Sequence, residues 1–376
     1  MSAPSVLRVG ERQLKRLAVG LGRAVTRTEQ NSPIDPYHVR SILVVRQHNQ
    51  LGDMLCVVPL LRGLRSRFPE CRIVLLTSPV NHAIMKHHRL LDDVINYDKG
   101  EFLRNGRIRF GALRDFRRTL RVHAFDLAIV PATVSMSLTS DILAYFSGAR
   151  WRIGPGSLEG KGNPGAFLYT HPVDLSWADT PDRHQTLRNI DVCRGLSVNT
   201  SNLELEMTLL PEEMERGARE VAAIRAGVHT LVAFHAGAGK VPNRWPPESF
   251  AGLIRELYCR RGARIVIVKG PMDNEPVEHL TSMLGVPYYL IENRSIREIA
   301  SILSLANLLI SNDTGIMHVG AAAGSPVLSL FGPTSPNLWA PPGAKHRYIG
   351  SPTGVISDIP VSTVLEAALQ MLPEHD

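Results

Sequence analysis

Short apolar runs alternate with amphipathic stretches along most of the chain from Ser41 onward. Continuous runs of Val, Ile and Leu predict buried strands, and apolar residues at helical spacing predict helices. In the first half, the predicted strands cover residues 42–45, 73–76, 94–97 and 127–130. The predicted helices cover residues 54–68, 110–122 and 136–146. This order predicts a parallel sheet with helices on both of its faces.

The alternation stops between residues 148 and 181, where Gly and Pro are frequent. This composition predicts a mobile loop region. A helix is then predicted over 186–195, and the extended, polar stretch 203–209 predicts a connector to a second domain.

A second alternation follows the connector. Its predicted strands cover residues 231–234, 264–268, 288–291, 308–310 and 326–331. Its predicted helices cover residues 212–226, 247–260, 277–284, 317–323 and 361–371. Another helix is predicted to begin at Ser295, because Ser295 and Glu298 have the spacing of a capping box. The fold class is therefore α/β, with two doubly wound domains in succession.

Length and composition are typical of a two-domain globular enzyme. The chain has 376 residues, of which 44% are apolar and 20% charged. No apolar run is long enough to span a bilayer, and the N-terminus lacks the apolar region of a signal peptide. Four Cys residues lie far apart, which argues against a zinc site or disulfide framework and favours a cytoplasmic protein.

The net charge of +7 predicts an anionic partner. Residues 1–38 form a basic amphipathic segment and linker, which we interpret either as an anchor on an anionic membrane leaflet or as a solvated extension. Residues 99–121 hold eight Lys or Arg against two acidic residues, and the alternatives there are contact with a phosphorylated lipid or a solvated face. No nucleic-acid-binding pattern accompanies these charges.

A strand, a tight turn, a small-residue helix and a second strand are predicted over 308–331. Asp313, Thr314 and Gly315 lie in the turn, at the carboxyl end of a strand, where open α/β sheets bind ligands. The free N–H groups at the start of the helix are suited to an anion. An ordinary helix cap is the alternative, and the turn alone does not distinguish the two.

Candidate catalytic and binding residues follow two other predicted strands. Asp53 is the only carboxylate in the first strand–helix junction, where it is either a helix cap or a general base. Residues 237–240 (Gly-Ala-Gly-Lys) followed by Arg244 can hold a diphosphate, or they form an ordinary surface loop. No G-x-G-x-x-G opens a first strand–helix turn, which argues against a dehydrogenase.

Three segments resemble glycosyltransferase family 9, the ADP-heptose:lipopolysaccharide heptosyltransferases. The longest is Asp-Thr-Gly-Ile-Met-His at 313–318, with a small-residue helix and then Phe-Gly-Pro-Thr at 331–334. The others are Leu-Gly-Asp at 51–53 and Arg-Trp-Pro at 244–246. Family members commonly have Ser residues where this chain has His-Asn-Gln at 48–50, and Lys in place of Arg244. The resemblance implies a GT-B fold, in which two Rossmann-like domains face each other across a cleft.

The resemblance also implies residue roles. Asp53 would be the catalytic base, and Arg244 would neutralise the leaving diphosphate. The implied donor site consists of Gly237, Ala238, Gly239, Lys240, Arg244, Glu275, Asp313, Thr314, Gly315 and His318. Asp273 is the alternative to Glu275, and neither a metal ligand nor a cofactor is implied. From Ser41 onward, the resemblance and the alternation of elements together predict an acceptor-binding domain at 39–205, a nucleotide-sugar-binding domain at 206–355 and a C-terminal helix at 356–376, while the basic extension and linker at 1–38 lie outside the resemblance.

The implied reaction is an inverting, metal-independent transfer of a heptose or related sugar. The donor would be a nucleotide-sugar, above all ADP-heptose, and the acceptor a lipopolysaccharide inner core or another lipid-linked, phosphorylated glycan. The enzyme would be cytoplasmic and peripheral on the inner membrane, without a nucleic-acid partner. The alternatives are transfer of another sugar to a different acceptor, a sugar-nucleotide epimerase of the same architecture, and a catalytically silent binding module.

Overall fold

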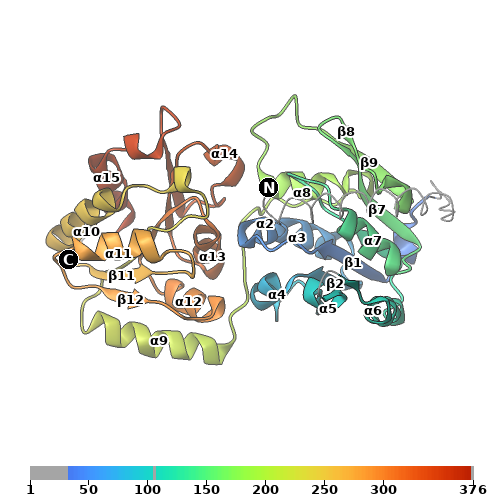
Figure 1. Cartoon of the computed structure of the whole chain (residues 1–376), viewed down its shortest axis with the longest axis horizontal. Coiled ribbons are helices and arrows are strands. Elements are labelled where there is room, and N and C mark those ends of the chain that lie inside the picture. The colour runs from blue at the N-terminus through green and yellow to red at the C-terminus, as the bar shows by residue number, and fades with distance from the viewer. Residues whose placement is uncertain (1–32, 105–106, 374–376) are drawn as a thin grey trace.

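The computed structural model describes residues 33–104 and 107–373, which form two α/β domains side by side (Figure 1). The predicted alternation of strands and helices is confirmed in both halves. Residues 203–209 contain neither helix nor strand and join the two domains, as predicted. The amphipathic segment predicted before residue 33 lies outside the described residues.

The N-terminal sheet has the strand order β3-β2-β1-β6-β7-β8, with β9 paired to β7. Only the β7–β8 pair is antiparallel. The strands are β1 (Ser41–Arg46), β2 (Arg72–Thr77), β3 (Asp93–Asn96), β6 (Leu127–Ile129), β7 (Trp151–Leu158), β8 (Lys161–Gly162) and β9 (His171–Leu175). The helices are α2 (Leu51–Leu55), α3 (Val58–Arg67), α4 (Pro79–Met85), α5 (Lys99–Phe102), α6 (Phe110–Val122), α7 (Leu138–Phe146) and α8 (Gln185–Asp191). A small hairpin of β4 (Leu103–Arg104) and β5 (Arg107–Ile108) precedes α6.

The C-terminal sheet is parallel throughout, in the order β12-β11-β10-β13-β14-β15. Its strands are β10 (Leu231–His235), β11 (Arg264–Val268), β12 (Tyr289–Ile291), β13 (Leu308–Asn312), β14 (Val327–Phe331) and β15 (His346–Gly350). Its helices are α9 (Pro211–Arg225), α10 (Pro247–Arg261), α11 (Asn274–Ser282), α12 (Ile296–Leu303), α13 (Gly315–Ala323), α14 (Pro336–Trp339) and α15 (Val361–Met371). The predicted capping box of Ser295 and Glu298 is present at the start of α12.

The prediction of a single helix over 54–68 is wrong. The structure has α2 ending at Leu55 and α3 beginning at Val58. Pro59, near the start of α3, has no N–H to donate to the carbonyl of Leu55, and its ring would clash with that carbonyl. The break makes α2 a short, separate helix next to the end of β1.

The prediction of a mobile loop over 148–181 is also wrong, because β7, β8 and β9 lie within it. Its glycines allow close packing. A Cβ on Gly154 would lie 2.1 Å from the Tyr169 ring, and one on Gly165 would lie 2.3 Å from the Asp141 carboxylate. Tyr169 donates a short hydrogen bond to Asp141, and burial raises the pKa of that carboxyl to about 6. The segment is therefore part of the sheet, with a buried polar pair beneath it.

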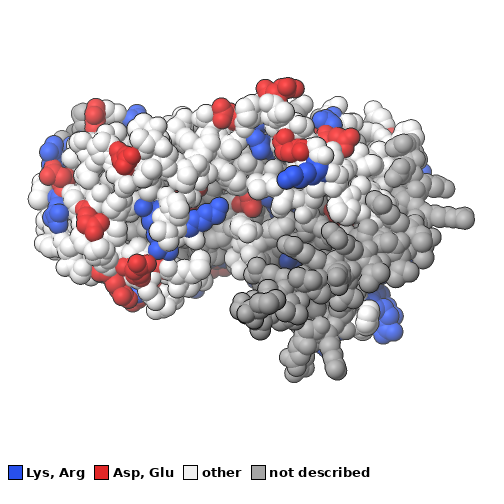
Figure 2. Space-filling view, turned by 45° about the horizontal axis from the view of Figure 1, so that its top comes forward, with Lys and Arg blue, Asp and Glu red and all other residues white. Residues whose placement is uncertain are grey.

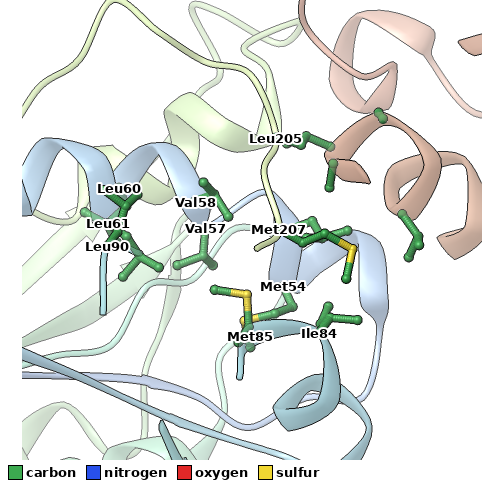
Figure 3. Close-up of a cluster of buried hydrophobic side chains, with 14 of the residues drawn as sticks. Met54, Val57, Val58, Leu60, Leu61, Ile84, Met85, Leu90, Leu205 and Met207 are labelled. Atoms are coloured by element: carbon green, nitrogen blue, oxygen red, sulfur yellow. The ribbon is translucent and has the colours of Figure 1, made fainter. Parts of the chain in front are cut away.

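One cluster of buried apolar side chains continues from the N-terminal domain into the C-terminal one. Figure 3 shows Met207 of the connector next to Met54 of α2 and Met85 of α4, and Leu205 of the connector belongs to the same cluster. The Met207 N–H also donates to the carbonyl of Ala322 at the end of α13, at 3.0 Å. Because hydrophobic burial is the main favourable term in folding, this shared core holds α2 and α13 together at the domain junction.

Candidate active site

Two helices that follow strands of different sheets pack against each other at the junction. A Cβ added to Gly52 of α2 would lie 2.5 Å from Cδ2 of His318 in α13. A Cβ added to Gly315, the first residue of α13, would lie 3.2 Å from Cβ of Leu51. The first strand–helix junction of the N-terminal domain therefore directly contacts the motif at residues 313–318 of the C-terminal domain, for which the family resemblance implies donor binding (the donor motif).

Asp53 lies in the first turn of α2 but does not cap it. The N-cap residue is Gln50, and no side chain makes a capping hydrogen bond there. The Asp53 side chain is 18% exposed, and its Oδ1 lies 3.7 Å from Nη2 of the buried Arg46. Burial raises the pKa of the Asp53 carboxyl, and the charge of Arg46 offsets part of that rise. A carboxylate so placed, with access to solvent, is suited to accept a proton.

Asp273 packs against the loop at residues 237–240 that follows β10, here called the glycine loop. A Cβ on Gly237 would lie 2.0 Å from the Asp273 carboxylate, so only glycine fits without movement. Asp273 accepts a hydrogen bond from the Gly270 N–H at 2.8 Å, and its Oδ2 lies 3.9 Å from Nε2 of His235. Asp273 is buried, so we assign it to the support of this loop rather than to a ligand.

Arg244 is held beside the same loop. Its Nε donates to the carbonyl of Ala238 at 3.0 Å, and its Nη1 lies 3.3 Å from Oε2 of Glu275. The Glu275 side chain is 88% exposed, whereas that of Arg244 is 20% exposed. The loop therefore has a fixed cation behind it and an accessible carboxylate at its edge.

The turn that contains Asp313, Thr314 and Gly315, here called the motif turn, has its own hydrogen-bond network. Asp313 accepts from the Nδ2 of Asn243 at 3.1 Å, and the same Nδ2 lies 3.3 Å from the Thr334 hydroxyl. Burial raises the pKa of Asp313, which the Thr334 hydrogen bond and the nearby charge of Lys240 partly offset. Thr314 is the N-cap residue of α13, and its side chain makes no capping hydrogen bond. The first N–H groups of α13 and the Thr314 hydroxyl are therefore suited to an anion.

The chain resembles proteins of known family in sequence. The sequence model of glycosyltransferase family 9 (heptosyltransferase) matches residues 113–360, well over half of the chain. The chain belongs to this family. Lipopolysaccharide heptosyltransferase 2 of Escherichia coli (strain K12) is 22% identical over 314 residues, which cover 81% of this chain and 86% of the relative.

Solved structures of the family share the fold. The family 9 glycosyl transferase from Veillonella parvula is 23% identical, with a TM-score of 0.76, and the match covers 92% of this chain and 98% of that one. E. coli heptosyltransferase WaaC with ADP is 18% identical, with a TM-score of 0.68, over 88% of this chain and 99% of that one. The predicted GT-B fold is confirmed. The chain is a glycosyltransferase of the lipopolysaccharide-heptosyltransferase type, which decides against the epimerase alternative.

His318 lies at the domain junction in this transferase. It is 3% exposed, and its ring lies against Gly52 and 6.4 Å from the ring of Trp339 in an edge-to-face arrangement. Burial lowers the pKa of His318 to about 3, so the ring is neutral at physiological pH. Its role toward a nucleotide, which the family resemblance implies, stays a prediction.

Asn312 is a site residue that the sequence did not single out. Its Nδ2 donates to the carbonyls of Ala236 and Gly237 at 2.9 and 3.2 Å, and its Oδ1 accepts from the Trp245 N–H at 3.1 Å. One amide therefore joins the glycine loop, the Arg244 segment and the motif turn. Its position as a polar residue at the end of a buried strand was the only available signal. Within residues 33–104 and 107–373, no group of three or more His, Cys, Asp or Glu is placed to hold a metal ion.

Proposed function

We propose that this transferase moves a heptose from ADP-heptose to the inner core of a lipopolysaccharide or a similar phosphorylated glycan, with inversion at the anomeric carbon and without a metal. The placement of Asp53 at the junction, on a helix packed directly against the donor motif, carries the proposal. The names of the relatives and the structures of E. coli WaaC with ADP and with ADP-2-deoxy-2-fluoro heptose support the choice of donor and acceptor.

The diphosphate would bind between the glycine loop and the start of α13. Backbone N–H groups from residue 315 onward and the Thr314 hydroxyl would donate to its oxygens. Lys240 and Arg244 would supply positive charge, and Arg keeps its charge at any physiological pH. Glu275, exposed at the edge of this loop, would accept hydrogen bonds from ribose or sugar hydroxyls.

The reaction is then a direct displacement. Asp53 accepts the proton of the acceptor hydroxyl, and that oxygen forms a bond to the anomeric carbon through an oxocarbenium-like state. The bond from the anomeric carbon to the diphosphate oxygen breaks, and ADP leaves with the electron pair. Because the leaving group is already a stabilised anion, no second carboxylic acid has to protonate it. Arg244, Lys240 and the N–H groups at the start of α13 stabilise the negative charge that develops on the leaving diphosphate.

Arg46 is expected to set the pH range of the enzyme. Its charge lowers the pKa of Asp53, so Arg46→Gln should raise that pKa and move the acidic limb of the kcat/KM profile to higher pH by about one unit. The profile is measured on a soluble acceptor, and thermal unfolding shows whether the variant is folded. An acidic limb that stays in place or moves to lower pH would contradict Asp53 as the titrating base.

Two substitutions test the donor site. Arg244→Ala should weaken ADP-heptose binding by about tenfold to a hundredfold, and Thr314→Ala by about tenfold, because charge-assisted and hydroxyl hydrogen bonds to the diphosphate are lost. Arg255→Ala on α10 removes an exposed arginine and is the matched control. Competition calorimetry with ADP-, UDP- and GDP-sugars should show tightest binding of ADP-heptose. Unchanged affinity in both variants would move the phosphate site elsewhere, and equal affinity for all three nucleotides would overturn the choice of ADP.

Contact with an anionic membrane is part of the proposal, because a lipid-linked acceptor lies in a leaflet and a bound enzyme meets it at a higher local concentration. No helix in the described ranges is long and apolar enough to cross a bilayer. The basic segment at 1–38 remains a proposed anchor, with residues 1–32 outside the described part of the chain.

A further inference from the structure

Helix α6 carries a stripe of arginines on the surface of the N-terminal domain. Arg114, Arg117, Arg118 and Arg121 are spaced three or four residues apart, so they share one side of the helix. Together with Val122 they line a shallow depression of about 370 Å³. Arg114, Arg118 and Arg121 are exposed, and Arg117 lies over the ring of Phe146 at 5.6 Å.

These charges are poorly compensated. In the described part of the chain, Asp115 is the only carboxylate within 4 Å of the stripe, and it lies 3.6 Å from Arg114 with both side chains exposed. Elsewhere, Arg65, Arg183 and Arg297 each have a carboxylate oxygen within 2.6 Å. On the face shown in Figure 2, basic and acidic side chains are interspersed. Like charges at this helical spacing destabilise a helix, so the stripe is unfavourable to the fold taken alone.

The opposite side of α6 is well packed. Leu120 is buried, and Leu113 and Phe116 pack against the apolar cluster on this side of the sheet. At the two ends of the helix, however, Phe110 is 75% exposed and Val122 is 79% exposed. The surface of α6 therefore presents a line of cations flanked by two apolar side chains, on a helix fixed to the sheet.

We propose that this arginine stripe docks the transferase on an anionic membrane leaflet. The proposal rests on the function proposed above, because a lipid-linked acceptor places the substrate in such a leaflet. Phosphate headgroups complement the four arginines, and Phe110 and Val122 are placed to enter the boundary between headgroups and acyl chains. A soluble phosphate or a nucleic acid backbone would match the charges but would leave these apolar side chains in water.

The position of α6 is compatible with catalysis on the bound enzyme. Figure 1 shows α6 at the outer part of the N-terminal domain, on the far side from the C-terminal domain. Asp53 and the donor motif lie at the junction between the domains. A leaflet in contact with α6 therefore does not cover the donor site, and the saccharide part of the acceptor has to extend from the leaflet toward the junction.

Co-sedimentation of the full chain with vesicles tests the proposal. Vesicles of equal parts phosphatidylglycerol and phosphatidylcholine are compared with pure phosphatidylcholine, at low and high salt. Arg114→Gln, Arg118→Gln and Arg121→Gln combined should weaken binding to the anionic vesicles by about a hundredfold at low salt. Phe110→Ser should weaken it by about tenfold without any change of charge.

The matched control removes the same charge where carboxylates compensate it. This control combines Arg216→Gln, Arg219→Gln and Arg294→Gln. The three arginines line the groove between α9 and α12, which is also lined by Glu213, Glu220 and Glu298. This control should bind the vesicles nearly as the parent does. The α6 arginine variant should unfold at the parent temperature or slightly above it, because like-charge repulsion is removed, and all variants should be folded and keep the parent turnover on a soluble acceptor.

The outcomes separate the docking surface from the proposed function. The proposal is overturned if the α6 variant and the control lose vesicle binding equally. It is also overturned if vesicle binding does not fall as the salt concentration rises. Loss of binding on deletion of residues 1–32 with no effect of the α6 substitutions assigns docking to the N-terminal segment and also overturns it. A higher KM for the soluble acceptor in the α6 variant would assign the stripe to the glycan instead. If no protein turns over any acceptor, the proposed function fails, whatever the vesicles show.

Discussion

Asp53→Asn is expected to lower turnover by at least about a hundredfold while leaving the affinity for ADP within about twofold. The amide has nearly the same shape as the carboxylate but cannot accept the proton of the acceptor hydroxyl. Asp53 is not the N-cap of α2 and makes no capping hydrogen bond, so its loss should not unravel the helix. Single-turnover kinetics with ADP-heptose, together with calorimetry of ADP binding, separate chemistry from donor affinity.

Asp182→Asn, at an exposed carboxylate, is the matched control and should behave as the parent. Turnover of Asp53→Asn within a few-fold of the parent would show that Asp53 is not the base. Loss of ADP binding along with turnover would instead indicate that Asp53 supports the donor site or the fold.

Gly52→Ala is expected to have the second large effect, through the domain junction. The added Cβ would lie 2.5 Å from Cδ2 and 2.8 Å from Nε2 of His318, closer than such atoms approach. His318 is buried against Trp339 and has little room to move. The helices have to separate, at a cost of about 1–3 kcal/mol in the free energy of unfolding. Because Asp53 is the next residue, turnover should fall as well.

A double-mutant cycle makes this prediction specific. His318→Ala removes the ring that the new methyl group would meet, so Gly52→Ala combined with His318→Ala should be less destabilised than the sum of the single variants. Gly111→Ala is the matched control, because its Cβ would meet nothing within 4 Å. If Gly52→Ala unfolds at the parent temperature with parent turnover, or if the two substitutions are additive, the contact between α2 and α13 does not couple the sites.

The sequence predicted the periodic elements well, because each depends on residues close together in the chain. The strands that end at Arg46, His235 and Asn312 contain continuous apolar runs, and the polar residues at and after their ends mark the candidate site. The family resemblance added roles for Asp53 and Arg244 that composition and spacing alone left open. Pro59 is a local signal for the break between α2 and α3. The apolar periodicity continues through it, however, and this periodicity predicts a single helix.

The failures depend on contacts between residues far apart in the chain. Gly154 has the appearance of a loop residue, but it is there because the Tyr169 ring lies against it. Asn312 joins three segments through hydrogen bonds to residues 67–76 positions away. The contact between Gly52 and His318 joins two domains across more than half of the chain. No local pattern of charge or hydropathy encodes such pairs.

The most direct test of the proposed function is a transfer assay with ADP-heptose and lipopolysaccharide inner-core acceptors, with and without a chelator. Mass spectrometry of the acceptor and measurement of released ADP follow the reaction, and NMR gives the configuration of the new bond. The proposed function predicts an acceptor heavier by one heptose, one ADP released per transfer, an inverted anomeric centre, and loss of all three signals in Asp53→Asn. An acceptor of unchanged mass, a retained configuration, or activity that disappears with the chelator would contradict it.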